Sequence, residues 1–494
     1  MVSDWKEETL DPSDWNELRS LGHRMLDDII NHQRDIAKKT QVFPTENTIK
    51  KICTPLPENG EGEQSVYEVF QNNIQPHISG SAHPRFWGAV GGTGSPYGML
   101  ASMLAAGLNY AVEETPTVAG YTHKQVIEWI IDLLGYPKDG GGVLVSGGSE
   151  ANYTALAVAR NARAEVDMKA KGMQGVPRRM IVYVSDGGHH CLERSVELLG
   201  IGGENLRWIE TGDDFRINLD SLRQAIKSDR EAGYYPFCVI GNAGTVDTGA
   251  FDDLNALADI AAMENLWFHI DGAFGSWVKI SKTYRHLANG LERADSVAVD
   301  LHKWMYMPYG IGCALVRDRL AHYSTFVYGH EAQYIKASRD LVKDFNEKLI
   351  RPDTLALPLS REWRSLKAYM LLRAYGRNKY SHLIQQNLDQ ANYLANLVEK
   401  DQEMELTAPV ASNVVCFRFN PGGLSEDELS VLNKKIISEI YRIRFWMISD
   451  TVIKGRFTLR AAITNHRSKR SDLDYVYHLV KELGQKAVSD MRLK

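Results

Sequence analysis

The chain of 494 residues is long enough for a full hydrophobic core and for more than one domain. Its hydrophobic content of 44% and charged content of 24% are ordinary for a globular protein. The net charge of −5 does not favour nucleic acid or an anionic membrane surface as a partner, and no stretch reaches the ~20 apolar residues of a membrane-spanning helix.

The cysteines and the first residues predict a cytoplasmic protein. There are five cysteines, an odd number, and none has Cys-x-x-Cys spacing, which disfavours a disulfide framework or a zinc ribbon and fits a reducing compartment. Residues 1–8 are acidic and polar, so we expect no signal peptide.

Residues 1–90 are predicted to form an N-terminal helical segment. Residues 11–14 are typical of a helix start, with Asp11 as the cap, and apolar residues then recur at helical spacing over 18–29. Because a long amphipathic helix must bury its apolar stripe, we expect it to be exchanged between two subunits, although docking on its own domain is the alternative. Residues 52–63, rich in Pro, Gly and Glu, predict an irregular linker.

Residues 91–375 are predicted to form a large α/β domain, because apolar runs alternate with amphipathic stretches. This pattern indicates a mostly parallel sheet with helices on both faces. The predicted strands are 142–146, 180–184, 237–241, 267–270, 296–299 and 312–316. A helical pattern over 359–375 leads out of this domain. Residues 376–494 predict a small α+β domain, with strands at 413–419 and 456–463 and a last helix at 472–487.

Two charged residues follow predicted strands, and ligands of open α/β sheets bind beyond the carboxyl ends of strands. Asp271 follows one buried run, and Lys303 comes just after another. A lysine that bonds to an aldehyde and an aspartate that pairs with a pyridine nitrogen are groups that a pyridoxal 5′-phosphate (PLP) enzyme cannot easily lack. Such a lysine needs a lowered pKa. The alternatives are a helix-capping aspartate and a lysine at the surface, although an exposed lysine does not usually close a buried strand.

Residues around these two are candidates to contact the same cofactor. Asp300 and His302 flank Lys303 and are candidate phosphate contacts, while Ala273 is small enough to let a ring lie against the backbone. In the motif of residues 145–149, Gly148 and Ser149 precede a predicted helix at 150–163, and glycines with a helix N-terminus suit a phosphate. By itself this motif is equally typical of a plain strand-to-helix turn.

His189 and Thr245 also follow predicted strands. The imidazole of His189 can lie on a cofactor ring and contact a substrate carboxylate, and the hydroxyl of Thr245 can bind the cofactor, but a lone histidine is usually structural and Thr245 also suits an ordinary turn. We expect no metal, because His189 and His190 are adjacent and no carboxylate or thiolate has ligand spacing.

Residues 326–353 predict a lid that excludes water. The stretch is long and highly charged and has no clear period, and loops of that length in compact domains are usually functional or disordered. Tyr334 lies within it and can deliver a proton to the carbon that loses its carboxylate, although a surface tyrosine is the alternative.

In their order along the chain, these motifs resemble the group II PLP-dependent decarboxylases, the family of aromatic-L-amino-acid, tyrosine and tryptophan decarboxylases. The resemblance covers almost the whole chain. It depends on residues 11–25, 83–87, 146–151, 185–189, 269–273, 300–303, 358–367 and 459–465. It implies a fold-type I homodimer with PLP at the subunit interface and decarboxylation of an L-amino acid, expected to be aromatic, to the amine and carbon dioxide.

The resemblance also implies roles for single residues. Lys303 resembles the PLP lysine, Asp271 the partner of the ring nitrogen and His189 the histidine stacked on the ring. Tyr334 matches a lid tyrosine associated with decarboxylation, whereas phenylalanine there is associated with aldehyde-forming relatives. The cofactor contacts it implies are Gly148, Ser149, Thr245 and Asp300.

The half of the site that holds the substrate departs from the family pattern. Aromatic decarboxylases usually follow the His-Pro motif with an aromatic pair, whereas this chain has Ala-Val-Gly-Gly-Thr at residues 89–93. The Glu-Leu-Glu motif that is common in the family is replaced around residues 121–124. Glu113 and Glu114 stand in a segment that is usually apolar. An aliphatic, acidic or cationic substrate therefore stays an alternative. The predicted substrate contacts are Trp87, Val90, Gly92, Thr93 and His189.

Other PLP-dependent reactions and a non-enzymatic role are alternatives to decarboxylation. An aminotransferase would need an arginine that holds the carboxylate in the ring plane, and the sequence marks none clearly; a retro-aldol lyase also stays open. Tyr334 disfavours an aldehyde synthase. A PLP-free dimer acting in regulation is disfavoured by Lys303, Asp271 and His189.

Overall fold

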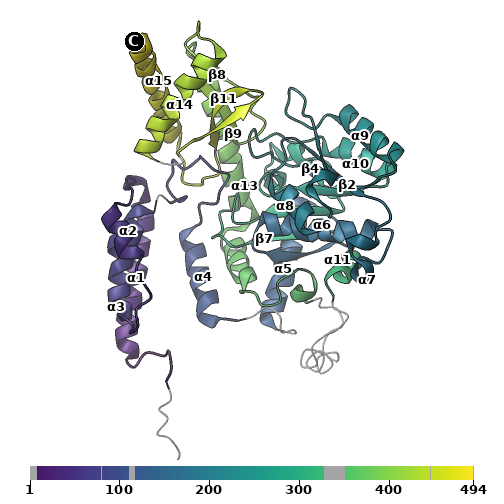
Figure 1. The fold of residues 1–494 in the computed structure, drawn as a ribbon. Coiled ribbons are helices and arrows are strands. Elements are labelled where there is room, and N and C mark those ends of the chain that lie inside the picture. Colours follow the sequence, from purple (N-terminus) through teal and green to yellow (C-terminus); the bar gives the residue numbers. More distant parts are fainter. Residues whose placement is uncertain (1–7, 79, 111–116, 328–350, 445–446, 493–494) are drawn as a thin grey trace, which may run out of the picture. The chain divides into compact units, whose positions relative to one another are not determined.

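The computed structural model describes residues 8–78, 80–110, 117–327, 351–444 and 447–492 (Figure 1). Tyr334, Glu113, Glu114 and most of the predicted lid lie outside these residues. The chain forms two compact units, one up to His83 and one from Pro84 onward. No helix of the described residues is both long and apolar enough to cross a membrane.

The first unit is helical, as the sequence predicts. Its α-helices are α1 (Trp15–Arg34), α2 (Glu46–Ile52) and α3 (Glu63–Val69). The prediction that Asp11 caps the first helix is wrong: Asp14, in extended backbone directly before Trp15, accepts a hydrogen bond from the amide of Asn16 at 2.7 Å. The hydroxyl of Tyr67 on α3 donates to Oδ2 of Asp28 on α1 at 2.8 Å, which joins the two helices.

The second unit contains a seven-stranded sheet in which one strand is reversed. The strand order is β1-β7-β6-β5-β4-β2-β3, and β7 is antiparallel to both of its neighbours. The strands are β1 (Gly141–Val145), β2 (Met180–Ser185), β3 (Leu206–Ile209), β4 (Tyr235–Asn242), β5 (Trp267–Asp271), β6 (Ser296–Asp300) and β7 (Gly312–Val316). The six predicted strands and the mostly parallel sheet are confirmed. The short edge strand β3 was not predicted.

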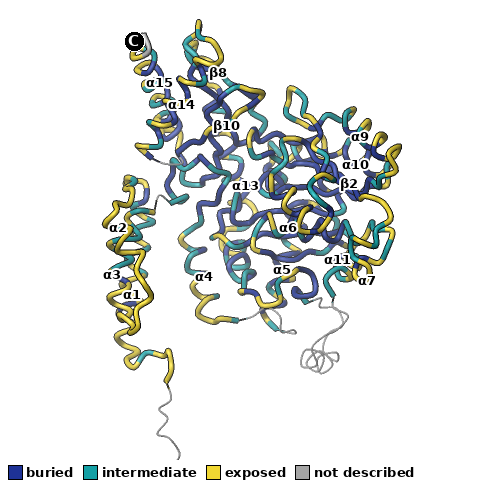
Figure 2. Tube along the Cα trace, viewed as in Figure 1, coloured by how far each residue is buried: buried dark blue, intermediate teal, exposed yellow. Residues whose placement is uncertain are grey.

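Alternate residues of the strands belong to two separate cores, one on each face of the sheet. Ile181 and Tyr183 pack in one cluster with apolar residues of α5, α9 and α10, whereas Val182 and Val184 pack with α6 and α8. The α-helices before, between and after these strands are α4 (Pro96–Leu108), α5 (Val118–Leu134), α6 (Gly148–Arg163), α7 (Met168–Lys171), α8 (Cys191–Leu198), α9 (Leu219–Glu231), α10 (Leu254–Met263) and α11 (Arg319–Phe326). Figure 2 shows the buried strands and the exposed outer sides of α9 and α10.

The C-terminal part of the second unit carries an antiparallel four-stranded sheet in the order β10-β11-β9-β8. Its strands are β8 (Met404–Leu406), β9 (Val414–Phe419), β10 (Ser449–Ile453) and β11 (Arg456–Ala462), and its helices are α14 (Glu426–Ile443) and α15 (Arg470–Arg492). Helix α13 (Arg364–Glu399) leads into it and bends at Gly376, where φ is +66°, beside the predicted domain boundary at residue 375.

Residues 84–90 belong to the second unit, although the sequence analysis placed them in the N-terminal segment. Trp87 explains why: its amide donates to the carbonyl of Met447 at 3.0 Å, and its carbonyl accepts from the amide of Ala462 at 2.8 Å. Its fully buried indole packs in the core of the four-stranded sheet. The backbone of this segment is therefore tied to β11 and to the residues before β10.

Candidate functional site

A cavity of about 370 Å³ lies where residues at the carboxyl ends of five parallel strands meet. These residues are Ser149 after β1, His189 after β2, Thr245 after β4, and Asp271 at the end of β5; Lys303 follows β6 and completes the group. Their convergence follows from the sheet, because the carboxyl ends of parallel strands lie at one edge.

The turn between β1 and α6 has no room for side chains at its glycines. A Cβ atom at Gly148 would lie 2.8 Å from Oδ2 of Asp300 and 3.1 Å from Cβ of Ala273, and one at Gly147 would lie 3.0 Å from Cε1 of His302. The turn therefore places the backbone amides at the start of α6 close to the cavity, where they and the helix dipole suit an anion.

Lys303 is paired with a buried carboxylate. Its Nζ lies 3.1 Å from Oδ2 of Asp300, whose side chain is 1% exposed. Burial alone would lower the pKa of Lys303, but the charges of Asp300 and Asp271 reverse this effect, so the pKa of Lys303 is raised. The pKa of Lys303 is therefore shifted in the direction opposite to the expected lowering. Asp300 borders the glycine turn, and its predicted phosphate contact stays a prediction.

Asp271 is held by hydrogen bonds on both carboxylate oxygens. Oδ1 accepts from the amide of Ala273 at 3.1 Å, and Oδ2 accepts from Nδ2 of Asn152 at 3.1 Å. Asn152 is fully buried and also lines the cavity. Asn152 was not among the predicted site residues, although its position one turn after Gly148 on the same helix face was a usable signal.

His189 lines the cavity on the side of β2. Its Nδ1 accepts from the amide of Cys191 at 3.2 Å. Burial lowers the pKa of His189, and the charge of Asp271 opposes this shift only in part. The imidazole is therefore favoured in its neutral form, with Nε2 left as the donor.

The polar atoms of Thr245 and His302 form hydrogen bonds with neighbouring residues of the chain. The hydroxyl of Thr245, which lines the cavity, accepts from the amide of Ala250 at 3.1 Å and bonds the hydroxyl of Thr248 at 3.0 Å. Nδ1 of His302 lies 2.9 Å from the carbonyl oxygen of Ile311. Burial lowers the pKa of His302.

The predicted substrate contacts divide into two groups. Val90 and His189 line the cavity, and Gly88 and Ala89 lie beside Val90 in its wall. Trp87 is directed away from it, and its Nε1 donates to Oγ of Ser468 at 2.9 Å. Gly92 lies against the backbone of His302, where an added Cβ would overlap the carbonyl oxygen, and Thr93 is buried. These three residues do not line this cavity within the described part of the chain.

Arg460 of β11 also lines the cavity, which the sequence analysis did not foresee. Its Nε donates to the carbonyl of Val246 at 3.0 Å, and its NH1 donates to the carbonyl of Gly88 at 3.3 Å and to Oγ of Ser449 at 3.0 Å. The guanidinium thus fixes two segments of the cavity wall. A charged residue between the apolar Leu459 and Ala461 of a predicted strand was the signal that could have marked it.

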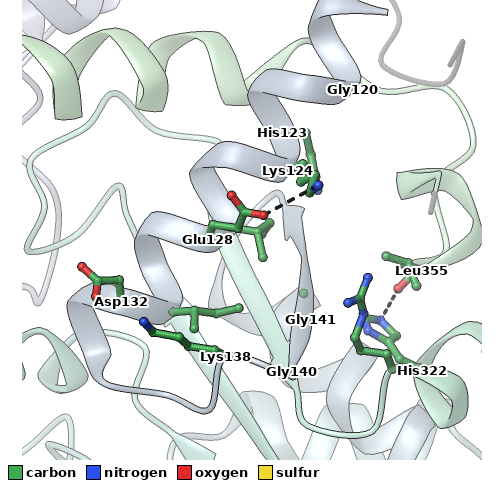
Figure 3. Close-up of a pocket in the computed structure, with 14 residues that line it drawn as sticks. Gly120, His123, Lys124, Glu128, Asp132, Lys138, Gly140, Gly141, His322 and Leu355 are labelled. Carbon is green, nitrogen blue, oxygen red and sulfur yellow. Dashed lines mark hydrogen bonds and ion pairs between the residues drawn. The ribbon is translucent and has the colours of Figure 1, made fainter. Parts of the chain in front are cut away.

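A second cavity, of about 440 Å³, lies between α5, the start of β1 and α11 (Figure 3). Its wall carries the ion pair of Lys124 and Glu128 at 3.8 Å, and Nε2 of His322 donates to the carbonyl of Leu355 at 2.7 Å. None of the predicted site residues that the structure describes lines it. Chemistry rather than size therefore identifies the smaller cavity as the candidate active site.

The residues of the smaller cavity fit PLP. The glycine turn between β1 and α6, which has no room for a Cβ atom, suits the phosphate of PLP. The Asp271 carboxylate suits the protonated ring nitrogen, and the Lys303 amine suits the aldehyde. Among the described residues, no cluster of three or more His, Cys, Asp or Glu side chains has the arrangement of a metal site.

Comparison with known proteins gives matches over nearly the whole chain. The model of the pyridoxal-dependent decarboxylase conserved domain matches residues 45–420. An aromatic-L-amino-acid decarboxylase of Bacillus atrophaeus is 32% identical over 476 residues, which cover 95% of this chain and 96% of the relative. A phenylacetaldehyde synthase of Arabidopsis thaliana is 28% identical over 490 residues, covering 96% and 97%.

A solved structure has the same fold. The crystal structure of Oryza sativa TDC with PLP and tryptamine superposes with a TM-score of 0.88 at 24% identity, covering 97% of this chain and 99% of the other. At this identity the likeness concerns the architecture alone.

Proposed function

Because the chain belongs to the pyridoxal-dependent decarboxylase family, we propose that it converts an aromatic L-amino acid to the corresponding amine and carbon dioxide. It is a PLP-dependent carboxy-lyase that acts on an amino acid. The observation that carries the proposal is the convergence of Lys303, Asp271 and His189 on one cavity.

Each of these side chains has a task that its surroundings support. When bound, PLP supplies an aldehyde that bonds to amines and a ring that accepts the electron pair released as the carboxylate leaves. Lys303 would hold the cofactor through its ε-amine and would take and return a proton at Nζ. Asp271 would hold the proton of the ring nitrogen, because its carboxylate is fixed by two donors. His189 would lie against the ring and donate to the substrate carboxylate.

The phosphate would lie at the start of α6. Gly148 and Thr245 line the cavity, and Ser149, an exposed residue, adds a hydroxyl beside Gly148. Since the first amides of a helix lack partners within it, they are free to bind phosphate oxygens. Closure of residues 326–353 would exclude water, and Tyr334 would protonate the carbon that lost its carboxylate.

The aromatic substrate is supported by the relative that shares 32% of its residues with this chain, an aromatic-L-amino-acid decarboxylase. The wall formed by Gly88, Ala89 and Val90 has small side chains, and Phe274 is the aromatic residue among those that line the cavity in the described chain. Small side chains leave room for a planar ring of the substrate.

A screen of the proteinogenic amino acids for carbon dioxide release by the PLP-loaded enzyme tests this function. We expect release from tyrosine, tryptophan or phenylalanine, and none above background from Lys303→Ala. Faster release from an aliphatic, acidic or cationic amino acid would refute the aromatic assignment. After borohydride reduction, mass spectrometry should find the cofactor attached to Lys303; attachment at another lysine would contradict the role of Lys303.

An aldehyde synthase is the second candidate, because the phenylacetaldehyde synthase of Arabidopsis thaliana is 28% identical to this chain. Assay of the amine, the aldehyde and hydrogen peroxide in the same reaction separates the two. Amine without peroxide supports decarboxylation alone.

A cytoplasmic homodimer with the cavity at the subunit interface completes the proposal. Apolar residues are exposed on α1, where Trp15 is 60% and Met25 44% exposed, and on α4, where Met103 is 52% and Leu108 63% exposed. Surfaces of this kind are usually covered by another chain. All five cysteines lie in the described residues as free thiols, which fits a reducing compartment.

A further inference from the structure

A line of buried hydrogen bonds leads to Asp271 from behind the cavity. Nδ2 of Asn152 donates to Oδ2 of Asp271 at 3.1 Å, and Oδ1 of Asn152 lies 2.8 Å from Nε2 of His269. Nδ1 of His269 lies 2.9 Å from Oγ of Ser296, to which Nε1 of Trp267 donates at 2.8 Å. Four contacts therefore connect five side chains.

The secondary structure explains how these residues meet. Trp267, His269 and Asp271 alternate along β5, so their side chains lie on the same face of the sheet. The register pairs His269 with Ser296 on β6, and α6, which packs on both strands, brings Asn152 to that face. Asn152, His269 and Ser296 have no exposed surface, so solvent does not supply alternative partners.

In each hydrogen bond along this line, the donor lies on the side farther from Asp271 and the acceptor on the side nearer to it. Burial lowers the pKa of His269 to about 4, so its ring carries a single proton near neutral pH. Because Asn152 presents its amide nitrogen to Asp271, its carbonyl oxygen faces His269 and accepts from Nε2–H. Nδ1 of His269 then accepts from the hydroxyl of Ser296, which accepts from the indole of Trp267. Every donor points toward Asp271.

We propose that Asn152, His269 and Ser296 are positioning residues that hold the carboxylate of Asp271 oriented toward the ring nitrogen of the cofactor. The inference rests on the proposed role of Asp271. Hydrogen bonds to the charged form of a carboxylate favour that form, and they are stronger in a dry interior than in water. A charged Asp271 in turn keeps the ring nitrogen protonated, which strengthens the ring as an electron acceptor.

The test uses holoenzyme loaded with PLP that carries ¹⁵N in its ring, because the ¹⁵N chemical shift reports protonation of that nitrogen directly. In His269→Leu, the Asn152 amide is no longer fixed, and we expect the ¹⁵N signal to move toward the unprotonated position. We expect kcat to fall roughly 10- to 100-fold and KM to change less than about threefold, the size expected for a lost hydrogen bond to a charged group.

Two further variants separate positioning from general damage to the core. His322→Leu is the matched control, because His322 is also a buried histidine, 1% exposed, but bonds the carbonyl of Leu355 and lies outside this line; its ¹⁵N signal should equal that of the wild type. His269→Gln keeps a donor for Asn152 and should restore most of the signal. If His269→Leu does not fold, Ser296→Ala, which removes one hydroxyl, should shift the signal in the same direction by a smaller amount.

The outcomes distinguish the inference from the proposed function. If His269→Leu or its substitute Ser296→Ala binds the labelled cofactor with an unchanged ¹⁵N signal while Asp271→Ala shifts it, the positioning role is refuted and the role of Asp271 stands. If Asp271→Ala itself leaves both the signal and turnover unchanged, the role of Asp271 fails and the positioning role fails with it.

Discussion

The ε-amino nitrogen of Lys303 lies 3.1 Å from Oδ2 of Asp300, three residues earlier in the chain, and the carboxylate is almost completely buried. The pKa of Lys303 is raised, since the charges of Asp300 and Asp271 outweigh the effect of burial. The site therefore favours the protonated form of the lysine, although an amine must be neutral to attack an aldehyde. Attachment of PLP requires this ion pair to give up a proton.

Asp300→Asn should speed the attachment of PLP to the apoprotein near neutral pH. Loss of the Asp300 charge lowers the pKa of Lys303, and each unit of that decrease raises the neutral fraction about tenfold at a pH below the pKa. Stopped-flow absorbance over a pH series measures the rate. Asp318→Asn, which alters the cap of α11 instead, is the control and should keep the wild-type profile. A wild-type profile for Asp300→Asn would contradict the prediction.

Gly148→Ala should weaken PLP binding by an order of magnitude or more. The new Cβ would lie 2.8 Å from Oδ2 of Asp300 and 3.1 Å from Cβ of Ala273, so the turn must shift where the phosphate would bind. Titration of the apoprotein with PLP, followed by absorbance, gives the Kd. Gly60→Ala is the matched control, because a Cβ there has nothing within 4 Å; equal affinity of the two variants would count against the assigned phosphate position.

The protein should lose stability as the pH falls from about 6.5 to about 4. Burial lowers the pKa of His269, His322 and His466 to about 4 and that of His123 to about 3. In this window the unfolded chain binds protons at these positions and the native chain does not, so each histidine lowers the free energy of unfolding by about 1.4 kcal/mol per pH unit.

Denaturant unfolding of the apoprotein at several pH values measures this loss. His322→Gln removes one of the four groups and should make the decline shallower by up to about 1.4 kcal/mol per pH unit. His478→Gln alters an exposed histidine and should leave the slope unchanged. Identical slopes for His322→Gln and the wild type would mean that His322 is not a neutral, buried group.

Tyr334→Phe should divert part of the product from amine to aldehyde. Without the proposed proton donor, the negative charge at the reacting carbon persists long enough to react with dioxygen, and aldehyde, ammonia and hydrogen peroxide form. Chromatography of the amine and the aldehyde, with a coupled peroxide assay, measures the partition. Amine formation at the wild-type rate without peroxide would exclude Tyr334 as the proton donor.

The strands of the large sheet could be predicted because their burial is visible locally. The runs that became β2, β5 and β6 are mostly apolar and wholly buried, and they end in polar residues. The missed strands β3, β8 and β10 are partly exposed, and β3 and β8 are also short, so they lack such a run. The mistaken helix cap at Asp11 reflects the choice between two aspartates three residues apart, which depends on the backbone angle at Asp14.

The sequence by itself determined which residues follow the parallel strands, and therefore that Lys303, Asp271 and His189 meet, because strand ends are encoded by short-range hydrophobic patterning. Only the tertiary structure decided that Asn152 supports Asp271, that Trp87 lies in the other core and that Arg460 contacts Gly88 across 372 positions of the chain. Such contacts depend on how helices and sheets pack, and packing joins residues whose separation along the chain carries no periodic signal.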